Sequence, residues 1–369
     1  MRIEITRESL LEPLLAVNGV VEKRQTLPVL SNVLLQVSQK SMVFTGTDLE
    51  IQLTASTSNF KLLSEESGEI TLPARKLTDI CKNFPEGSLI TISIERERAT
   101  IRSGKSRFTL TTLPAQDFPV MESIKSVSEL TVQKKALKKL LEKTQFCMAN
   151  QDVRYYLNGL LIETKDDQLT AVATDGHRLA KSSITLDYTN QEQQIIIPRK
   201  GIQELFRLLD DSEEICKLNL NNNFVQISLN SVTFFAKLID GRFPDYNRVI
   251  PAESDSIMTV SRDTLKQSLV RTSVLSNEKY RGIRLNLTKN KLSLSINNPE
   301  QEEAEEELDV MFNMDEPLEI GFNVSYLIDA LNAIHSEEVD IHLLDQNSSC
   351  LIMSKSDMAT KYVVMPMRL

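Results

Sequence analysis

The sequence contains an apolar pattern that occurs three times, at a spacing of roughly 120 to 125 residues, and this repeat limits the possible folds. In residues 77–84 the apolar positions fall at i, i+3, i+4 and i+7, which is one face of a helix. Residues 202–209 and 324–331 carry the same template, and each follows a short apolar segment. The chain therefore repeats one structural unit three times.

Other predicted elements recur at the same step. A helix is expected early in each unit, at residues 9–21, 134–146 and 263–275, and each unit ends on a strand and a proline turn. Three copies fill all 369 residues. We therefore predict domains at 1–125, 126–252 and 253–369. No linker rich in Pro, Gly or Ser separates them, so we expect the domains to abut rigidly.

The strands of each unit alternate apolar and polar residues. Residues 283–287 and 292–296 place apolar side chains at every second position, which is typical of a sheet with one buried face. Two helices among many short strands predict an α+β fold, with both helices on one face of antiparallel sheets.

Charge is segregated along the chain. The formal net charge is −9, but residues 300–309 hold seven acids and no base, so the rest of the chain is nearly neutral. The distribution of charge, not its total, decides whether a surface attracts phosphate. An acidic average therefore does not exclude nucleic acid as a partner.

No metal, cofactor or disulfide is predicted. The four cysteines, Cys81, Cys147, Cys216 and Cys350, are scattered singly without a C-x-x-C pair or a Cys/His cluster. The first residues read as a strand and not as a signal peptide, and no apolar stretch is long enough to span a membrane. We expect a cytoplasmic protein with no membrane partner.

Two segments are unusual enough to carry function. Residues 134–143 hold five lysines against Glu142, which suits either a solvated helix face or long-range attraction of phosphates. Residues 362–369 are apolar almost to the last residue, whereas chain ends are usually polar. That ending is either a strand in the core or an adaptable surface that accepts several partners.

An enzyme is the first alternative. The residues that look most catalytic are Asp175 and His177, but the other two histidines lie far away in the sequence. The sequence has no G-x-S-x-G elbow, P-loop, Rossmann fingerprint or H-E-x-x-H helix, and Asp-Gly reads more simply as a turn. We predict that the chain is not an enzyme.

Many long motifs, in order over the whole chain, resemble the beta subunit of bacterial DNA polymerase III, the beta sliding clamp family. They lie at 26–28, 45–50, 151–159, 173–180, 240–246, 276–279, 298–306, 321–326 and 364–369. The resemblance implies a homodimeric ring of six similar domains, of which each chain supplies half. Twelve helices packed at about 9 Å around such a ring leave an opening of about 25 Å, enough for a duplex.

The resemblance also implies site residues. Sequence-independent DNA contacts are expected at Arg24, Gln151, Tyr155, Tyr156, Arg199 and Lys200. A peptide groove is expected at Leu157, Thr174, Gly176, His177, Arg178, Leu179, Pro244, Arg248, Val249, Asn323, Tyr326, Ser349, Val363, Val364, Met365, Pro366, Met367 and Arg368. The dimer interface is expected at Phe108 and Leu110 against Val274 and Leu275.

The partners implied by the resemblance are duplex DNA, a second copy of the chain, the polymerase III alpha subunit, the clamp loader delta subunit, and other polymerases and repair proteins with short linear motifs. Such a protein associates with the nucleoid. The second alternative is a monomeric interaction scaffold that never encloses DNA. It accounts for the repeat and the apolar ending but not for the lysine-rich helix.

Overall fold

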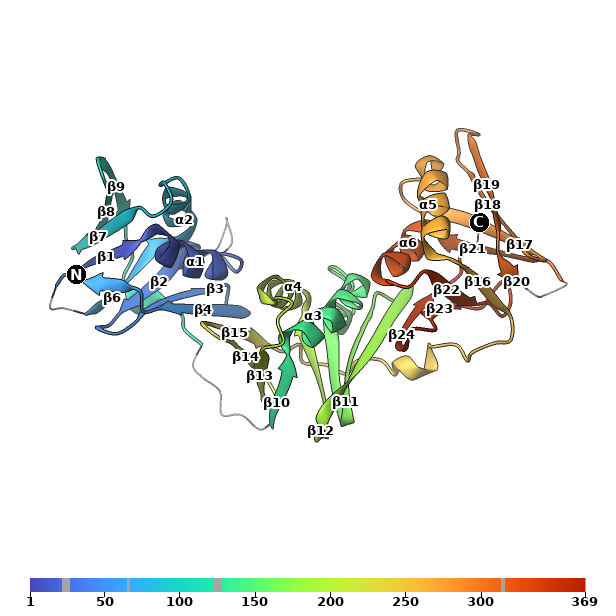
Figure 1. Ribbon diagram of the computed structural model, residues 1–369, viewed down its shortest axis with the longest axis horizontal. Coiled ribbons are helices and arrows are strands. Elements are labelled where there is room, and N and C mark those ends of the chain that lie inside the picture. Colours follow the sequence, from blue (N-terminus) through green and yellow to red (C-terminus); the bar gives the residue numbers. More distant parts are fainter. Residues whose placement is uncertain (22–26, 65–66, 122–127, 313–315, 369) are drawn as a thin grey trace. The chain divides into compact units, whose positions relative to one another are not determined.

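The structure is a computed structural model that describes residues 1–21, 27–64, 67–121, 128–312 and 316–368 (Figure 1). These residues form two compact units. The first unit is Met1–Lys135 with Gln203–Leu238, and the second is Ala136–Ile202 with Ile239–Leu369. Among these described residues the strands pair antiparallel and lie beside α-helices, which confirms the predicted α+β class.

The first unit contains two sheets. The smaller sheet has the order β5-β1-β7-β8-β9. Its strands are β1 (Arg2–Thr6), β5 (Phe60–Leu62), β7 (Leu89–Glu95), β8 (Arg98–Ser103) and β9 (Ser106–Thr111). The larger sheet has the order β10-β13-β14-β15-β4-β3-β2-β6. Its strands are β2 (Asn32–Val37), β3 (Met42–Thr47), β4 (Ile51–Thr57), β6 (Gly68–Pro73), β10 (Ser128–Gln133), β13 (Ile215–Leu220), β14 (Phe224–Leu229) and β15 (Val232–Lys237).

The second unit also contains two sheets. The larger one has the order β11-β12-β24-β23-β22-β16-β20. Its strands are β11 (Gly159–Thr174), β12 (Arg178–Pro198), β16 (Ile257–Ser261), β20 (Met311–Phe312), β22 (Glu338–His342), β23 (Cys350–Ser354) and β24 (Asp357–Val364). The smaller sheet, β19-β18-β17-β21, is built from β17 (Gly282–Thr288), β18 (Lys291–Asn297), β19 (Glu303–Asp309) and β21 (Leu318–Asn323).

The helices occur as the repeat predicts. In the described part of each third there are two α-helices: α1 (Arg7–Val17) and α2 (Ala74–Lys82), α3 (Lys134–Glu142) and α4 (Arg199–Leu208), α5 (Arg262–Thr272) and α6 (Val324–Ala333). Within the first unit α1 packs on α2, and α1 also covers β3 and β4. Within the second unit α5 packs on α6, and α6 contacts β21 and β24 (Figure 1).

The observed helix ends differ from the predicted ones by a few residues. The helix expected at 9–21 is α1, which begins at Arg7 because the Thr6 hydroxyl accepts a hydrogen bond from the amide of Ser9 and caps the first turn. The helices expected to reach 146 and 275 stop at Glu142 and Thr272. A 3-10 turn follows each: η3 (Gln145–Cys147) after two turn residues, and η6 (Ser273–Leu275) directly.

Sheets continue across the thirds of the chain. Strand β4 of the first third pairs with β15 of the second, with Ala55 opposite Val232 and Leu53 opposite Phe234. Strand β12 of the second third pairs with β24 of the last, with Leu179 opposite Val363. Backbone hydrogen bonds thus join the first third to the second within the first unit, and the second third to the last within the second unit.

Candidate functional site

A cavity of about 250 Å³ opens where β12 meets β24 in the second unit. It is lined by Arg154, Leu157, Thr174, Gly176, Arg178, Leu179, Phe243, Pro244, Tyr246, Val249, Val363 and Met365. These residues come from the 3-10 turn η4 (Tyr155–Leu157) and the residue before it, the β11–β12 turn, the loop with η5 (Tyr246–Arg248), and the end of β24. Segments distant in sequence thus meet at one apolar cavity.

The floor and the rim of this cavity differ in burial. Leu157, Leu179 and Val363 are at most 2% exposed and belong to one apolar cluster. Val249 and Met365, at the mouth, remain 44% and 43% exposed. A buried floor below an uncovered apolar rim is the arrangement that accepts an apolar side chain of a ligand.

The β11–β12 turn is fixed by its own side chains. The Asp175 carboxylate accepts hydrogen bonds from the amides of His177 (2.9 Å) and Arg178 (3.0 Å). Gly176 has φ +88°, a backbone conformation that favours glycine. A Cβ at Gly176 would also lie 2.8 Å from the guanidinium of Arg154, so no larger side chain fits without displacing that wall of the cavity.

Arg154 forms one wall of the cavity. Its guanidinium donates to both carboxylate oxygens of Asp152, at 3.0 and 2.8 Å, and to the carbonyl of Asp175 at 3.2 Å. The hydrogen bond from Arg154 is the main reason that the pKa of Asp152 falls to about 2. The pair stays charged at every physiological pH and holds the turn against the loop that precedes η4.

Arg178 forms another wall, and most of its donors are used inside the chain. Its Nε donates to Asp175 (3.0 Å), Nη1 to Asp329 (2.5 Å) and Nη2 to the carbonyl of Phe146 (2.9 Å). The guanidinium carbon lies 5.5 Å from the ring centre of Phe146 and 4.5 Å from that of Tyr326. The side chain of Arg178 is therefore a fixed surface and not a mobile arm.

The last residues of the chain line this cavity at Val363 and Met365 and then leave it. The amide of Met365 donates to the carbonyl of His177 (2.9 Å), and the amide of Met367 donates to the carbonyl of Gly321 (2.8 Å). Met367 and Arg368 line a separate cavity of about 600 Å³, with residues of β17 and β18. Tyr362, Val363 and Val364 are buried, so both interpretations of the ending hold in part: three residues are core and the next ones are at least partly exposed.

Of the 18 predicted peptide-groove residues, nine line the cavity and nine do not. The nine that line it are Leu157, Thr174, Gly176, Arg178, Leu179, Pro244, Val249, Val363 and Met365. Those that do not are His177, Arg248, Asn323, Tyr326, Ser349, Val364, Pro366, Met367 and Arg368. Of these, Asn323 caps α6 through the amide of Ser325, and Tyr326 contacts Arg178.

Three lining residues were not named from the sequence: Arg154, Phe243 and Tyr246. All three lie inside motifs that carry the family resemblance, at 151–159 and 240–246. Tyr246 donates a hydrogen bond to Glu163 (3.2 Å), and burial is the main cause that raises its pKa to about 12. The signal was present, but the motifs alone do not tell which of their side chains face the cavity.

The predicted DNA contacts lie in different environments. Gln151 and Tyr155 are exposed, and Tyr155 packs edge to face on Tyr156 at 5.8 Å. Arg199 donates to the carbonyl of Met148 (2.6 Å), and Lys200 also has an interaction inside the chain. Arg24 lies outside the described residues.

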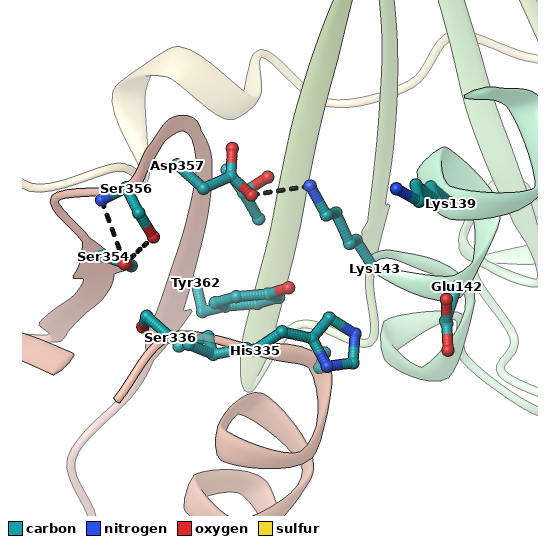
Figure 2. A pocket seen from close by; sticks show the side chains of 12 residues that line it. Lys139, Glu142, Lys143, His335, Ser336, Ser354, Ser356, Asp357 and Tyr362 are labelled. Atoms are coloured by element: carbon teal, nitrogen blue, oxygen red, sulfur yellow. Dashed lines mark hydrogen bonds and ion pairs between the residues drawn. The ribbon is translucent and has the colours of Figure 1, made fainter. Parts of the chain in front are cut away.

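Part of the positive charge of the lysine-rich helix α3 is neutralised by carboxylates of the same chain. Lys134 is 4% exposed and its ammonium binds Glu214 (2.5 Å) and Asp210 (3.5 Å). Lys143 binds Asp357 at 2.6 Å, across a cavity of about 430 Å³ in the second unit (Figure 2). Lys139, at the edge of the same cavity, is exposed.

The residues predicted for the dimer interface lie on the edge strand β9 or on the 3-10 turn η6. Phe108 on β9 is 39% exposed and packs edge to face on Phe84 at 5.8 Å, whereas Leu110 is buried in its own sheet. Val274, on η6, is 78% exposed. Strands β9 and β19 are both edge strands of their sheets.

The described residues contain no group of three His, Cys, Asp or Glu side chains that could hold a metal ion. All four cysteines are buried free thiols. Within the same described part of the chain, no helix is both long and apolar enough to cross a bilayer.

Comparison with known proteins covers the whole chain. Residues 1–122, 131–245 and 247–368 match the family models for the N-terminal, central and C-terminal domains of the DNA polymerase III beta subunit. The chain is 49% identical over 372 residues to the beta sliding clamp of Pseudomonas putida and 47% identical over 369 residues to that of Escherichia coli K12, with 100% of each chain covered.

Solved structures agree in fold over the full length. The DNA polymerase III subunit beta of Pseudomonas aeruginosa superimposes with a TM-score of 0.95 at 48% identity, covering 100% of both chains. A second structure of that sliding clamp, bound to griselimycin, gives a TM-score of 0.95 at 49% identity and the same coverage. The Caulobacter crescentus beta sliding clamp gives 0.94 at 36% identity, again over 100% of both chains.

Proposed function

Since this chain belongs to the DNA polymerase III beta subunit family, the beta sliding clamps, we propose that two copies close into a ring around duplex DNA and tether the replicative polymerase to it. The observation that carries the function is the full-length match to three successive clamp domains. As a sliding clamp the chain is a processivity factor and not an enzyme.

In this proposal each copy contributes domains 1–125, 126–252 and 253–369, and six domains form the ring. Phe108 and Leu110 of one copy face Val274 and Leu275 of the other. The exposure of Val274, at 78%, supports an apolar joint there because a second copy would cover it. Two such joints related by a twofold axis close the ring.

Charge supports the joint only in part. Among the acids of 300–309, Glu306 pairs with Arg271 (2.5 Å) and Glu307 with Lys291 (2.6 Å) inside the chain. The remaining acids of that segment are the ones that can attract Lys76, Lys105 and Arg107 of the partner copy, which are exposed. Exposed pairs of this kind steer association more than they strengthen it.

The duplex is held without base readout. Phosphate contacts carry no sequence information, so a ring that uses them can move along DNA. We assign such contacts to Arg24, Gln151, Tyr155, Tyr156, Arg199 and Lys200, together with the exposed Lys139 of α3. The exposure of Gln151 and Tyr155 supports this assignment. Because its partner is chromosomal DNA, the chain acts in the cytoplasm at the nucleoid.

The apolar cavity is the site for short linear peptides. Its partners are the polymerase III alpha subunit, the clamp loader delta subunit, and other polymerases and repair proteins. A leucine or phenylalanine anchor would bury against Leu179, Val363 and Val249, and Met365 at the rim would adapt to each partner. The griselimycin complex of the Pseudomonas aeruginosa clamp supports a ligand site in this family. We propose that griselimycin, used below as the probe ligand, binds the same cavity.

Topological linkage tests the ring. The chain is loaded on a nicked circular duplex and passed through a sizing column in 0.5 M salt, before and after the circle is cut once. Retention on the circle and loss from the linear duplex is the expected result. Loss from both forms, or equal retention on both, contradicts enclosure and supports a scaffold that binds DNA only from one side.

A second experiment tests the assigned DNA contacts. Replacing Arg24 and Gln151 with alanine should weaken loading and retention while the dimer stays intact by analytical ultracentrifugation. Lys40→Ala, which removes one exposed positive charge elsewhere, is the matched control. Wild-type retention of the double variant refutes the assignment of these two residues.

A further inference from the structure

We propose that Asp329 is a positioning residue of the peptide cavity, which acts by holding the guanidinium of Arg178 in place as a wall. The proposal rests on the peptide-binding function proposed above. Asp329 does not line the cavity, whereas Arg178 does. From the sequence, Asp329 stands out only as an acid on a helix without Lys or Arg.

The geometry around Arg178 points to Asp329 as the external anchor. Of the three groups that accept from the guanidinium, Asp175 belongs to the same turn as Arg178, and the carbonyl of Phe146 belongs to η3. Asp329 comes from α6, far along the chain, and makes the shortest bond, at 2.5 Å from Nη1. Among the described residues it is therefore the charged partner of Arg178 that ties the turn to another element.

Burial makes this partner necessary. The side chain of Arg178 is 13% exposed, and a charge taken out of water needs compensating charges and hydrogen bonds. Asp175 supplies one charge but also accepts from two backbone amides. Without the Asp329 carboxylate, one guanidinium nitrogen of Arg178 would lose its charged acceptor. The side chain would then move toward solvent at the cavity mouth.

Two aromatic rings near the guanidinium show what Asp329 adds. Phe146 and Tyr326 fix the plane of the guanidinium but not its rotation within that plane. Hydrogen bonds from Nε to Asp175, from Nη1 to Asp329 and from Nη2 to the carbonyl of Phe146 fix that rotation, and Asp329 is the acceptor for Nη1. The wall that a ligand meets is thus set by a residue that the ligand does not touch.

Asp329→Asn tests this role because it keeps the shape and removes the charge. With griselimycin as the probe ligand and isothermal titration calorimetry as the assay, we expect the dissociation constant to rise about fivefold. Asp329→Glu, which restores the carboxylate, should recover most of the affinity. Glu253→Gln is the matched control, because it removes one charge and one ion pair, to Lys361 of β24, outside the cavity.

A double-mutant cycle separates positioning from general stability. If Asp329 acts through Arg178, the effect of Asp329→Asn should nearly vanish in an Arg178→Lys background. Additive effects, or a D329N variant that binds as wild type does, overturn the positioning role. If the wild-type chain itself does not bind griselimycin, the proposed ligand site fails together with this inference. Binding by wild type and D329N alike removes the inference alone.

Discussion

Replacing Val249 and Met365 together with alanine should weaken ligand binding without unfolding the chain. Both side chains stand at the rim of the cavity, 44% and 43% exposed, so the folded chain depends little on them. A bound ligand would cover the exposed part. The loss of affinity should therefore follow from the area that only the ligand buries.

The expected loss can be worked out from these exposures. Val249→Ala removes two methyl groups, worth about 0.8 kcal/mol each when newly buried, and 44% of that is about 0.7 kcal/mol. Met365→Ala removes three heavy atoms, and 43% of their burial is about 1 kcal/mol. The sum of about 1.7 kcal/mol corresponds to a dissociation constant about 18-fold higher.

Calorimetric titration with griselimycin measures this loss. The matched control is the double variant Val120→Ala, Met358→Ala, whose side chains are 50% and 54% exposed and lie outside the cavity. The control should bind as wild type does. If the V249A/M365A variant also binds with wild-type affinity, the rim does not contact the ligand and the cavity is not the ligand site.

Two further predictions concern stability and the cysteines. Tyr362 is 1% exposed and its hydroxyl has no hydrogen-bond partner among the described residues, so Tyr362→Phe should stabilise the chain by about 1 kcal/mol and raise the urea midpoint. Burial raises the pKa of Cys81 and of Cys350 from 9.0 to about 12. Because the folded chain keeps these thiols protonated, their contribution to stability is full below pH 9 and is lost as the pH rises from 9 toward 12. Native chain at pH 8 should therefore react slowly with a disulfide reagent, and the rate should rise sharply in urea.

Each of these measurements has its own control. Tyr246→Phe removes a hydroxyl that donates to Glu163, so it should lower the urea midpoint where Tyr362→Phe raises it. A midpoint for Tyr362→Phe at or below that of wild type would show that the hydroxyl is satisfied. Rapid labelling of the folded chain at pH 8 would show that the thiols are not held in the core.

Much of the fold could be predicted because apolar residues recur at the regular spacings of helices and strands. The apolar face at 77–84 becomes α2, and Leu77 and Cys81 are fully buried there. The alternation at 283–287 becomes β17, with Ile283, Leu285 and Leu287 buried. Helix ends were less predictable, because a cap such as Thr6 depends on backbone geometry beyond the periodic residues.

The candidate site could be predicted only as a set of motifs. The motif at 240–246 contains Phe243 and Pro244, which both line the cavity, but only Pro244 was named from the sequence. The ending at 362–369 divides between core and surface because β24, paired with β12, ends at Val364. Sequence position does not reveal that register.

The repeat, the α+β class and the family can all be inferred from the residues alone, because periodic apolar faces and long motifs are properties of the linear chain. Which charges are available depends on how the chain folds. Lys134 and Lys143 look alike in a run of lysines, yet both bind carboxylates of distant segments, Glu214 and Asp357. Such ion pairs form when sheets and helices bring remote residues within a few ångströms, and a local sequence pattern does not predict which residues come together.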